Sequence, residues 1–124
     1  MDEYSSISLP VSESQLNLLE RLSNAVAVSG DEREVRAIVL EEIQPFADEV
    51  RVDALGNVLA VRHASGENPL RVMLAAHMDE VGFILVEEEE GGWHRFEVVG
   101  GVDPRVLAGK AVLVGKDHLP GVIG

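Results

Sequence analysis

The sequence predicts an α/β fold in which helices, a hairpin and a central buried strand precede a segment of short β-strands. Three observations predict this class. Apolar residues recur every three or four positions between residues 12 and 43, as on one face of a helix. The apolar run Val72–Ala76 is too short for a helix and has no polar alternation, which indicates a strand buried on both faces. Beyond Val81, short apolar stretches separated by glycine turns are typical of an all-β module.

Two helices are predicted at the start of this fold. The first begins at Ser12, because Ser12-Glu13-Ser14-Gln15 fits the capping box. In this motif the serine side chain accepts a hydrogen bond from the backbone N–H of the glutamine, and the glutamine side chain accepts one from the backbone N–H of the serine. The second runs from about Glu32 to Ile43, capped by Ser29 or Asp31 and stopped by Pro45. Both apolar stripes are expected to pack in the core; they consist of Leu16, Leu18, Leu19, Leu22 and Val26 in the first helix and Val35, Ile38, Val39 and Ile43 in the second.

A β-hairpin is predicted next, because the apolar period changes to two between residues 49 and 62. Its turn is Asp53-Ala54-Leu55-Gly56-Asn57, in which Gly56 and Asn57 can adopt positive φ. Asp53 is interpreted as a turn residue. His63 follows in a polar loop and is expected to face solvent rather than to bind a metal.

The segment after Val81 is predicted to hold strands at residues 83–86, 93–99, 111–114 and 122–123. Glu87–Glu90 repel one another, so we interpret them as an exposed turn rather than a cation site. His94 and His118 are likewise interpreted as exposed turn residues.

These patterns predict three parts: a flexible arm over residues 1–11, part of an α/β domain over residues 12–81, and the start of a β-rich domain over residues 82–124. The net charge of −12 repels phosphate backbones and anionic lipids, which argues against nucleic acids and membrane surfaces as partners. The chain has an acidic start and no apolar run long enough to cross a bilayer, so a cytoplasmic location is expected. With no cysteine, disulfides and thiol catalysis are excluded.

The candidate site lies where the predicted buried strand ends. His77 and Asp79 are two residues apart, so in a strand both side chains project to the same side. An imidazole can bind a metal while a neighbouring carboxylate fixes the orientation of the ring. Strand-end histidines are also common as hydrogen-bonded structural residues, so this pair alone leaves both interpretations open.

The wider sequence resembles a known family. Ala75-Ala76-His77-Met78-Asp79-Glu80-Val81-Gly82-Phe83 is similar to the metal-ligand strand of the M42 metallo-aminopeptidases, which include glutamyl and deblocking aminopeptidases and some proteins once labelled endoglucanases. Ser29-Gly30-Asp31-Glu32, Asp53-Ala54-Leu55-Gly56-Asn57 and Val99-Gly100-Gly101-Val102-Asp103 match the family as well. The resemblance extends from about Leu16 to Gly124 and corresponds to the N-terminal portion of a typical member.

The resemblance implies the start of a mixed-sheet α/β/α zinc-peptidase catalytic domain, followed by the beginning of an inserted all-β assembly domain. It implies hydrolysis of N-terminal residues from peptides by two divalent metal ions, zinc or cobalt, in a homo-oligomer that assembles through the β domain. By position, His77 would be a metal ligand and Asp79 the catalytic carboxylate that orients the site, whereas Glu80 receives no role. The remaining ligands and the general base have no counterpart here, so the chain alone is expected to bind no metal tightly and to be inactive.

Two further interpretations stay open. The chain could be a non-catalytic oligomerisation module that uses strand edges and apolar surface in the segment after Val81. It could also be an endoglucanase-like glycan hydrolase. That interpretation ranks last, because Asp79 and Glu80 are adjacent and would project to opposite faces of a strand rather than flank one bond.

Overall fold

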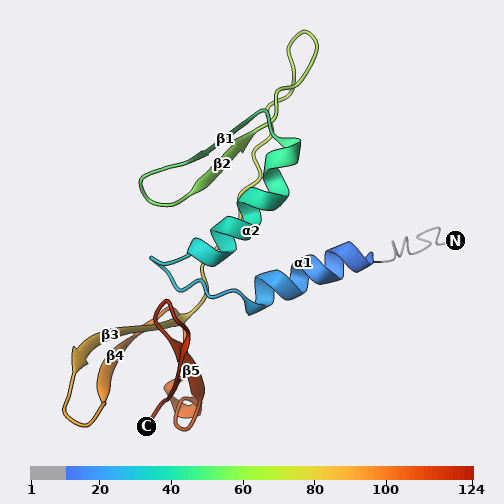
Figure 1. The fold of residues 1–124 in the computed structure, drawn as a ribbon. Helices are drawn as coiled ribbons and strands as arrows, with labels where there is room; N and C mark the ends of the chain where they lie inside the picture. The colour runs from blue at the N-terminus through green and yellow to red at the C-terminus, as the bar shows by residue number, and fades with distance from the viewer. Residues whose placement is uncertain (1–10) are drawn as a thin grey trace, which may run out of the picture. The chain divides into compact units, whose positions relative to one another are not determined.

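A computed structural model describes residues 11–124, which form two compact units that divide between Asp79 and Glu80 (Figure 1). The predicted arm over residues 1–11 lies, apart from Val11, outside the described residues. In the part of the chain that the structure describes, no helix is long and apolar enough to cross a membrane.

The first helix of the first unit is α1 (Glu13–Asn24), and it begins with the predicted capping box. Ser12 Oγ accepts a hydrogen bond from the backbone N–H of Gln15 at 3.3 Å, and Gln15 Oε1 accepts one from the backbone N–H of Ser12 at 2.8 Å. The expected core packing of its stripe is wrong, because no residue of α1 is buried and Leu16 and Leu19 are 54% and 61% exposed. An amphipathic period defines a helix without supplying the surface against which its apolar face packs.

The second helix is α2 (Arg33–Ile43), and the one-turn 3-10 helix η1 (Gln44–Phe46), which contains Pro45, ends it as predicted. Its N-cap is Glu32 and no side chain caps it, so the predicted caps are wrong. The carboxylate of Asp31 pairs with Arg33, and the hydroxyl of Ser29 donates a hydrogen bond elsewhere. Of the α2 stripe, only Val35 is buried.

The predicted hairpin is confirmed as β1 (Glu49–Val52) and β2 (Val58–Val61), which pair antiparallel from Glu49 opposite Val61 to Val52 opposite Val58. Helix α2 packs against β2 (Figure 1). The turn contains Gly56 at φ +88°, as predicted, whereas Asn57 does not adopt a positive φ. Asp53 is confirmed as a turn residue, because one carboxylate oxygen accepts hydrogen bonds from the backbone N–H groups of Leu55 and Asn57, at 2.9 and 3.0 Å.

The predicted buried strand Val72–Ala76 is wrong. Residues 71–79 form no strand, and Val72, Met73 and Leu74 are 72%, 87% and 94% exposed. A strand buried on both faces requires hydrogen-bonded neighbours at both edges and covering layers above and below. Among the described strands none pairs with this stretch, so its apolar side chains stay in contact with solvent.

The second unit is built of β-strands, as predicted. Strands β3 (Gly82–Glu88) and β4 (His94–Val99) form one antiparallel pair, and β5 (Ala111–Val114) and β6 (Leu119–Val122) form another. The one-turn 3-10 helix η2 (Pro104–Val106) lies between the two pairs. Three separate two-stranded antiparallel sheets are therefore present in residues 11–124, and a mixed sheet is not among them.

Local details of the second unit differ from the sequence prediction. Strand β3 extends through Glu88, so only part of the glutamate run lies in the turn. His94 begins β4 and is exposed, whereas His118 lies in a turn at φ +50° and is half-buried. Cross-strand packing stabilises the pairing of β3 with β4, because the rings of Phe83 and Phe96 meet edge to face with their centroids 4.9 Å apart.

Candidate functional site

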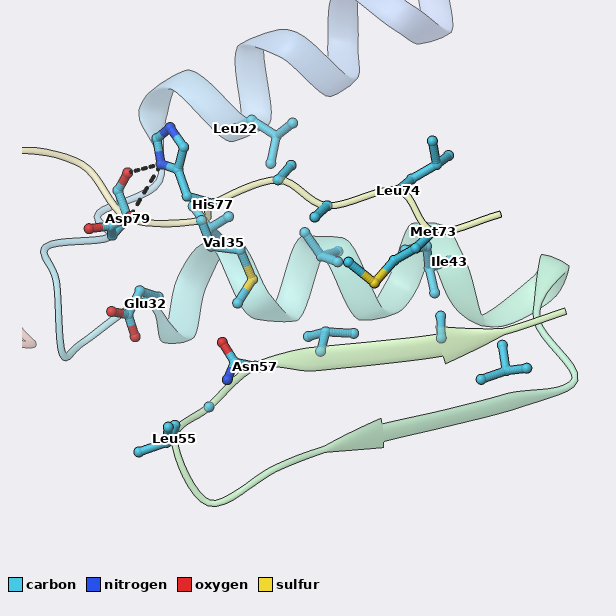
Figure 2. Close-up of a pocket in the computed structure, with 18 of the residues that line it drawn as sticks. Leu22, Glu32, Val35, Ile43, Leu55, Asn57, Met73, Leu74, His77 and Asp79 are labelled. Atoms are coloured by element: carbon cyan, nitrogen blue, oxygen red, sulfur yellow. Dashed lines mark hydrogen bonds and ion pairs between the residues drawn. The ribbon is translucent and has the colours of Figure 1, made fainter. Parts of the chain in front are cut away.

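The structure brings His77 and Asp79 together, although the strand expected to carry them does not form. His77 Nδ1 lies 3.2 Å from the Asp79 carboxylate oxygen Oδ1 and 2.9 Å from the main-chain carbonyl oxygen of Asp79 (Figure 2). The two residues thus face the same side because the chain folds back on itself locally, rather than because a sheet imposes an alternation.

These contacts determine which ring nitrogen of His77 is free. A carbonyl oxygen can only accept a hydrogen bond, so the Nδ1 that lies against it must carry the proton. In the neutral imidazole the lone pair then resides on Nε2, at the opposite side of the ring. The side chain of His77 is 83% exposed, so this nitrogen is accessible to a ligand.

A third residue holds the carboxylate of Asp79. Ser29 Oγ donates a hydrogen bond to Asp79 Oδ2 at 2.5 Å, so the two carboxylate oxygens serve different partners. This bond holds the pKa of Asp79 below its ordinary value, and the neighbouring imidazole of His77 lowers the pKa further. Both contacts therefore favour the ionised form of the Asp79 carboxylate.

Sequence reasoning missed Ser29, which it assigned as a helix cap. Ser29 and Asp79 are 50 residues apart, and nothing in the local pattern of either segment connects them. The one available signal was that Ser29 lies in Ser29-Gly30-Asp31-Glu32, a turn that resembles the family.

An apolar groove of about 1020 Å³ runs beside the site. It is lined by α2, by β2 and by the unpaired segment of residues 72–79, with Val35, Ile43, Met73 and Leu74 among its apolar side chains (Figure 2). His77 and Asp79 lie at one end of the groove, as does Glu32 (Figure 2). The apolar groove therefore has one polar end, which is formed by the imidazole of His77 and the carboxylates of Asp79 and Glu32.

His63 and two of the glutamates at residues 87–90 lie in pairs with other side chains. His63 is exposed, as expected, and its Nε2 lies 2.9 Å from Glu49 Oε1. In the glutamate run, Arg95 Nε pairs with Glu89 at 2.5 Å and Glu87 at 3.8 Å, which supports an ion-paired hairpin over a cation site.

The described residues supply an incomplete donor set for a metal ion. Nowhere in residues 11–124 do three or more His, Cys, Asp or Glu side chains gather with the geometry of a metal site. A structural or catalytic zinc needs three or four protein ligands, whereas this site offers one imidazole nitrogen and one carboxylate. His77 and Asp79 fit part of a metal site, but they are too few to complete the coordination of a zinc ion.

Comparisons with known proteins agree with the earlier resemblance. The M42 glutamyl aminopeptidase family matches residues 56–124. The lysyl aminopeptidase of Pyrococcus furiosus is 36% identical over 110 residues, which are 86% of this chain and 31% of that protein. The TET1 peptidase of Pyrococcus horikoshii, which can assemble into a tetrahedron or a large octahedral shell, superposes with a TM-score of 0.74 at 36% identity, over 88% of this chain and 32% of that one.

A structure described as an endoglucanase from Thermotoga maritima is also similar, with a TM-score of 0.76 and 43% identity over 86% of this chain and 33% of that one. The chain spans about a third of the length of the curated relatives it matches, 29% of one and 31% of three others. More than half of its residues match the family, and the matched part includes His77 and Asp79. This chain therefore belongs to the M42 glutamyl aminopeptidase family.

Proposed function

We propose that this chain is part of a dinuclear-metal aminopeptidase, which hydrolyses N-terminal residues from peptides, and that it contributes the metal ligand His77. His77 binds one metal through Nε2, and Asp79 orients the imidazole. The observation that supports these roles is the hydrogen bond from Nδ1 to the carbonyl of Asp79, since it leaves Nε2 accessible and unprotonated in the neutral ring. Two divalent ions, zinc or cobalt, supply an activated water and stabilise the developing oxyanion in such sites.

We propose further that these 124 residues alone bind no metal tightly and have no peptidase activity. The reason is the donor count: one imidazole and one carboxylate leave a divalent ion mostly solvated. The bridging carboxylate, the further ligands and the general base would have to come from outside the described residues. The mixed-sheet α/β/α catalytic domain belongs to the same proposal, with residues 12–81 as its beginning.

Residues 82–124 are proposed to begin an assembly domain through which a homo-oligomer forms in the cytoplasm. The support is the β-only character of this unit, its exposed apolar side chains and the shell-forming assembly described for the TET1 relative. Ile84, Leu85 and Val86 follow one another along β3 and are 56%, 46% and 54% exposed. Consecutive exposed apolar residues on a strand are typical of surfaces that another chain covers.

The same surface supports a second candidate function, a non-catalytic oligomerisation module. Glycan hydrolysis ranks below both, although one similar structure is described as an endoglucanase. Glycosidases need a carboxylic acid whose pKa is raised so that it can donate a proton, whereas the pKa of Asp79 is lowered by Ser29. Asp79 is therefore unsuited to the acid role.

A zinc titration followed by nuclear magnetic resonance tests the proposal on the chain as it exists. We expect zinc to perturb Nε2 of His77 selectively and weakly, with substoichiometric metal by elemental analysis and no release of leucine, glutamate or lysine from aminoacyl anilides. His77→Ala should abolish the zinc response, and His94→Ala serves as the matched control. A response at other histidines with His77 unaffected would contradict the metal role, and stoichiometric zinc with His77-dependent turnover would contradict the expected inactivity.

A further inference from the structure

Hydrogen bonds and an ion pair join three separate segments into one network. Two of these segments are the turn of residues 29–32 and the hairpin turn of residues 53–57. The third holds His77 and Asp79. The first link is the hydrogen bond from Ser29 Oγ to Asp79 Oδ2, which is 2.5 Å long and connects the turn before α2 to the site.

The turn that presents Ser29 is itself fixed. The backbone N–H of Gly30 donates to Glu32 Oε1 at 2.5 Å, and the backbone N–H of Asp31 donates to the carbonyl of Val28 at 2.8 Å. Gly30 adopts φ +93°, a conformation that L side chains rarely adopt. The position of the Ser29 hydroxyl therefore depends on the turn geometry and on the carboxylate of Glu32.

Glu32 connects this turn to the hairpin through Arg36. Glu32 Oε2 lies 3.8 Å from Arg36 Nη1, and both side chains are only 18% exposed. The same Nη1 donates a hydrogen bond to the carbonyl oxygen of Gly56 at 3.0 Å. One guanidinium thus links the hairpin turn to the turn that presents Ser29.

We propose that Ser29 is a positioning residue for His77: it holds the Asp79 carboxylate so that Oδ1 stays beside Nδ1 as a second acceptor, in addition to the carbonyl of Asp79, and so strengthens the preference for the Nδ1–H form. Glu32 and Arg36 hold the turn that carries Ser29. This inference rests on the proposed function for its biological meaning, because a fixed Nε2 lone pair matters where that nitrogen binds a metal.

The hydroxyl group of Ser29 is the part of the side chain that fixes the orientation of the Asp79 carboxylate. Asp79 Oδ1 faces the imidazole, whereas Oδ2 accepts the serine hydroxyl, so removing the hydroxyl frees the carboxylate to rotate away from His77. Ser29 is exposed, so threonine keeps the donor and places its additional methyl group in solvent. Alanine removes the donor, and cysteine replaces it with a weak S–H donor of similar shape.

The test is the tautomer of His77, read from long-range ¹H–¹⁵N correlations of its ring in the full 124-residue chain. Spectra are recorded at pH ~8.5, about two units above the ordinary imidazole pKa of ~6.5. His77→Ala identifies the signals. We expect a dominant Nδ1–H form in the wild type. In Ser29→Ala the ratio of Nδ1–H to Nε2–H should fall about fivefold, as expected when one ordinary hydrogen bond is weakened.

Three further variants make the result specific. Ser29→Thr should restore the wild-type ratio, Ser29→Cys should give an intermediate ratio, and Ser65→Ala, in an exposed loop, should leave the ratio unchanged. A wild-type ratio in both Ser29→Ala and Ser29→Cys overturns the proposal, as does an equal fall in Ser29→Thr. Since no metal is present in these spectra, failure of His77 to respond in the zinc titration would overturn its ligand role and leave this result standing.

Discussion

Single residues in this chain often depend on a specific neighbouring oxygen. For His77 it is the carbonyl of Asp79, which accepts the Nδ1–H proton and so leaves Nε2 unprotonated in the neutral ring. For Arg36 it is the carbonyl of Gly56, which the guanidinium reaches because that residue has no side chain. Removing or blocking one such contact should have local and measurable effects.

Gly56→Ala should destabilise the first unit for two reasons. The residue adopts φ +88°, and a Cβ built there would lie 2.5 Å from Arg36 Nη1, so the guanidinium must move and lose its bond to the carbonyl. A left-handed conformation costs a non-glycine residue about 1–2 kcal/mol. We expect a lower urea midpoint by circular dichroism. Gly66→Ala shares the positive φ, at +104°, but meets no atom within 4 Å, so an equal loss in both variants would argue against the Arg36 contact.

Asp53 should make the hairpin turn sensitive to acid. Its pKa is lowered by the side-chain hydrogen bond from Asn57, then by backbone hydrogen bonds from Asn57 and Leu55. Because the folded pKa lies below the unfolded one, the contribution of Asp53 to stability is complete above the unfolded value of ~3.9 and disappears as the pH falls through the folded value. The NMR chemical shift of the Asn57 backbone amide should therefore follow the ionisation of Asp53, with a midpoint below the ordinary carboxyl pKa of ~3.9. A midpoint at or above it, or the same titration in Asp53→Asn, would contradict this assignment.

At the scale of elements, locally determined features could be predicted from sequence. The α1 capping box involves residues three positions apart, and the hairpin is determined by its period and its turn residues. Val72–Ala76 could not be predicted in the same way, because an apolar run becomes a strand only where other strands pair with it. For the site, sequence placed His77 beside Asp79, but Ser29 and the Glu32–Arg36 link depend on tertiary contacts that no local pattern encodes.

The unpaired segment should promote self-association. Met73 and Leu74 are 87% and 94% exposed, and an exposed apolar stretch with free backbone N–H and C=O groups can pair with another chain. We expect Leu74→Lys to lower the fraction of large species in size-exclusion chromatography with light scattering. Leu55→Lys is a matched control, because Leu55 is 86% exposed but lies in the hairpin turn. Equal effects of both changes would indicate a general response to added charge.

At the scale of the whole molecule, each unit buries little apolar surface. The buried apolar residues of the described chain are Ala27, Val35 and Ile123. Many large apolar side chains are instead exposed, and the net charge of −12 opposes association through them at low ionic strength. Small units of this kind have a low free energy of unfolding, because a smaller protein buries a smaller fraction of its surface on folding. The two units therefore need not unfold together.

Two spectroscopic probes can separate the units. Within the described residues both α-helices, α1 and α2, lie in the first unit, and the chain's one tryptophan, Trp93, lies in the second. Helical circular dichroism at 222 nm consequently reports the first unit, whereas tryptophan fluorescence reports the second. Because each unit has its own internal contacts, we expect two urea unfolding curves with different midpoints. Gly56→Ala should lower the midpoint by dichroism and leave that by fluorescence unchanged. Coincident curves that shift together in this variant would show that residues 11–124 unfold as one cooperative unit.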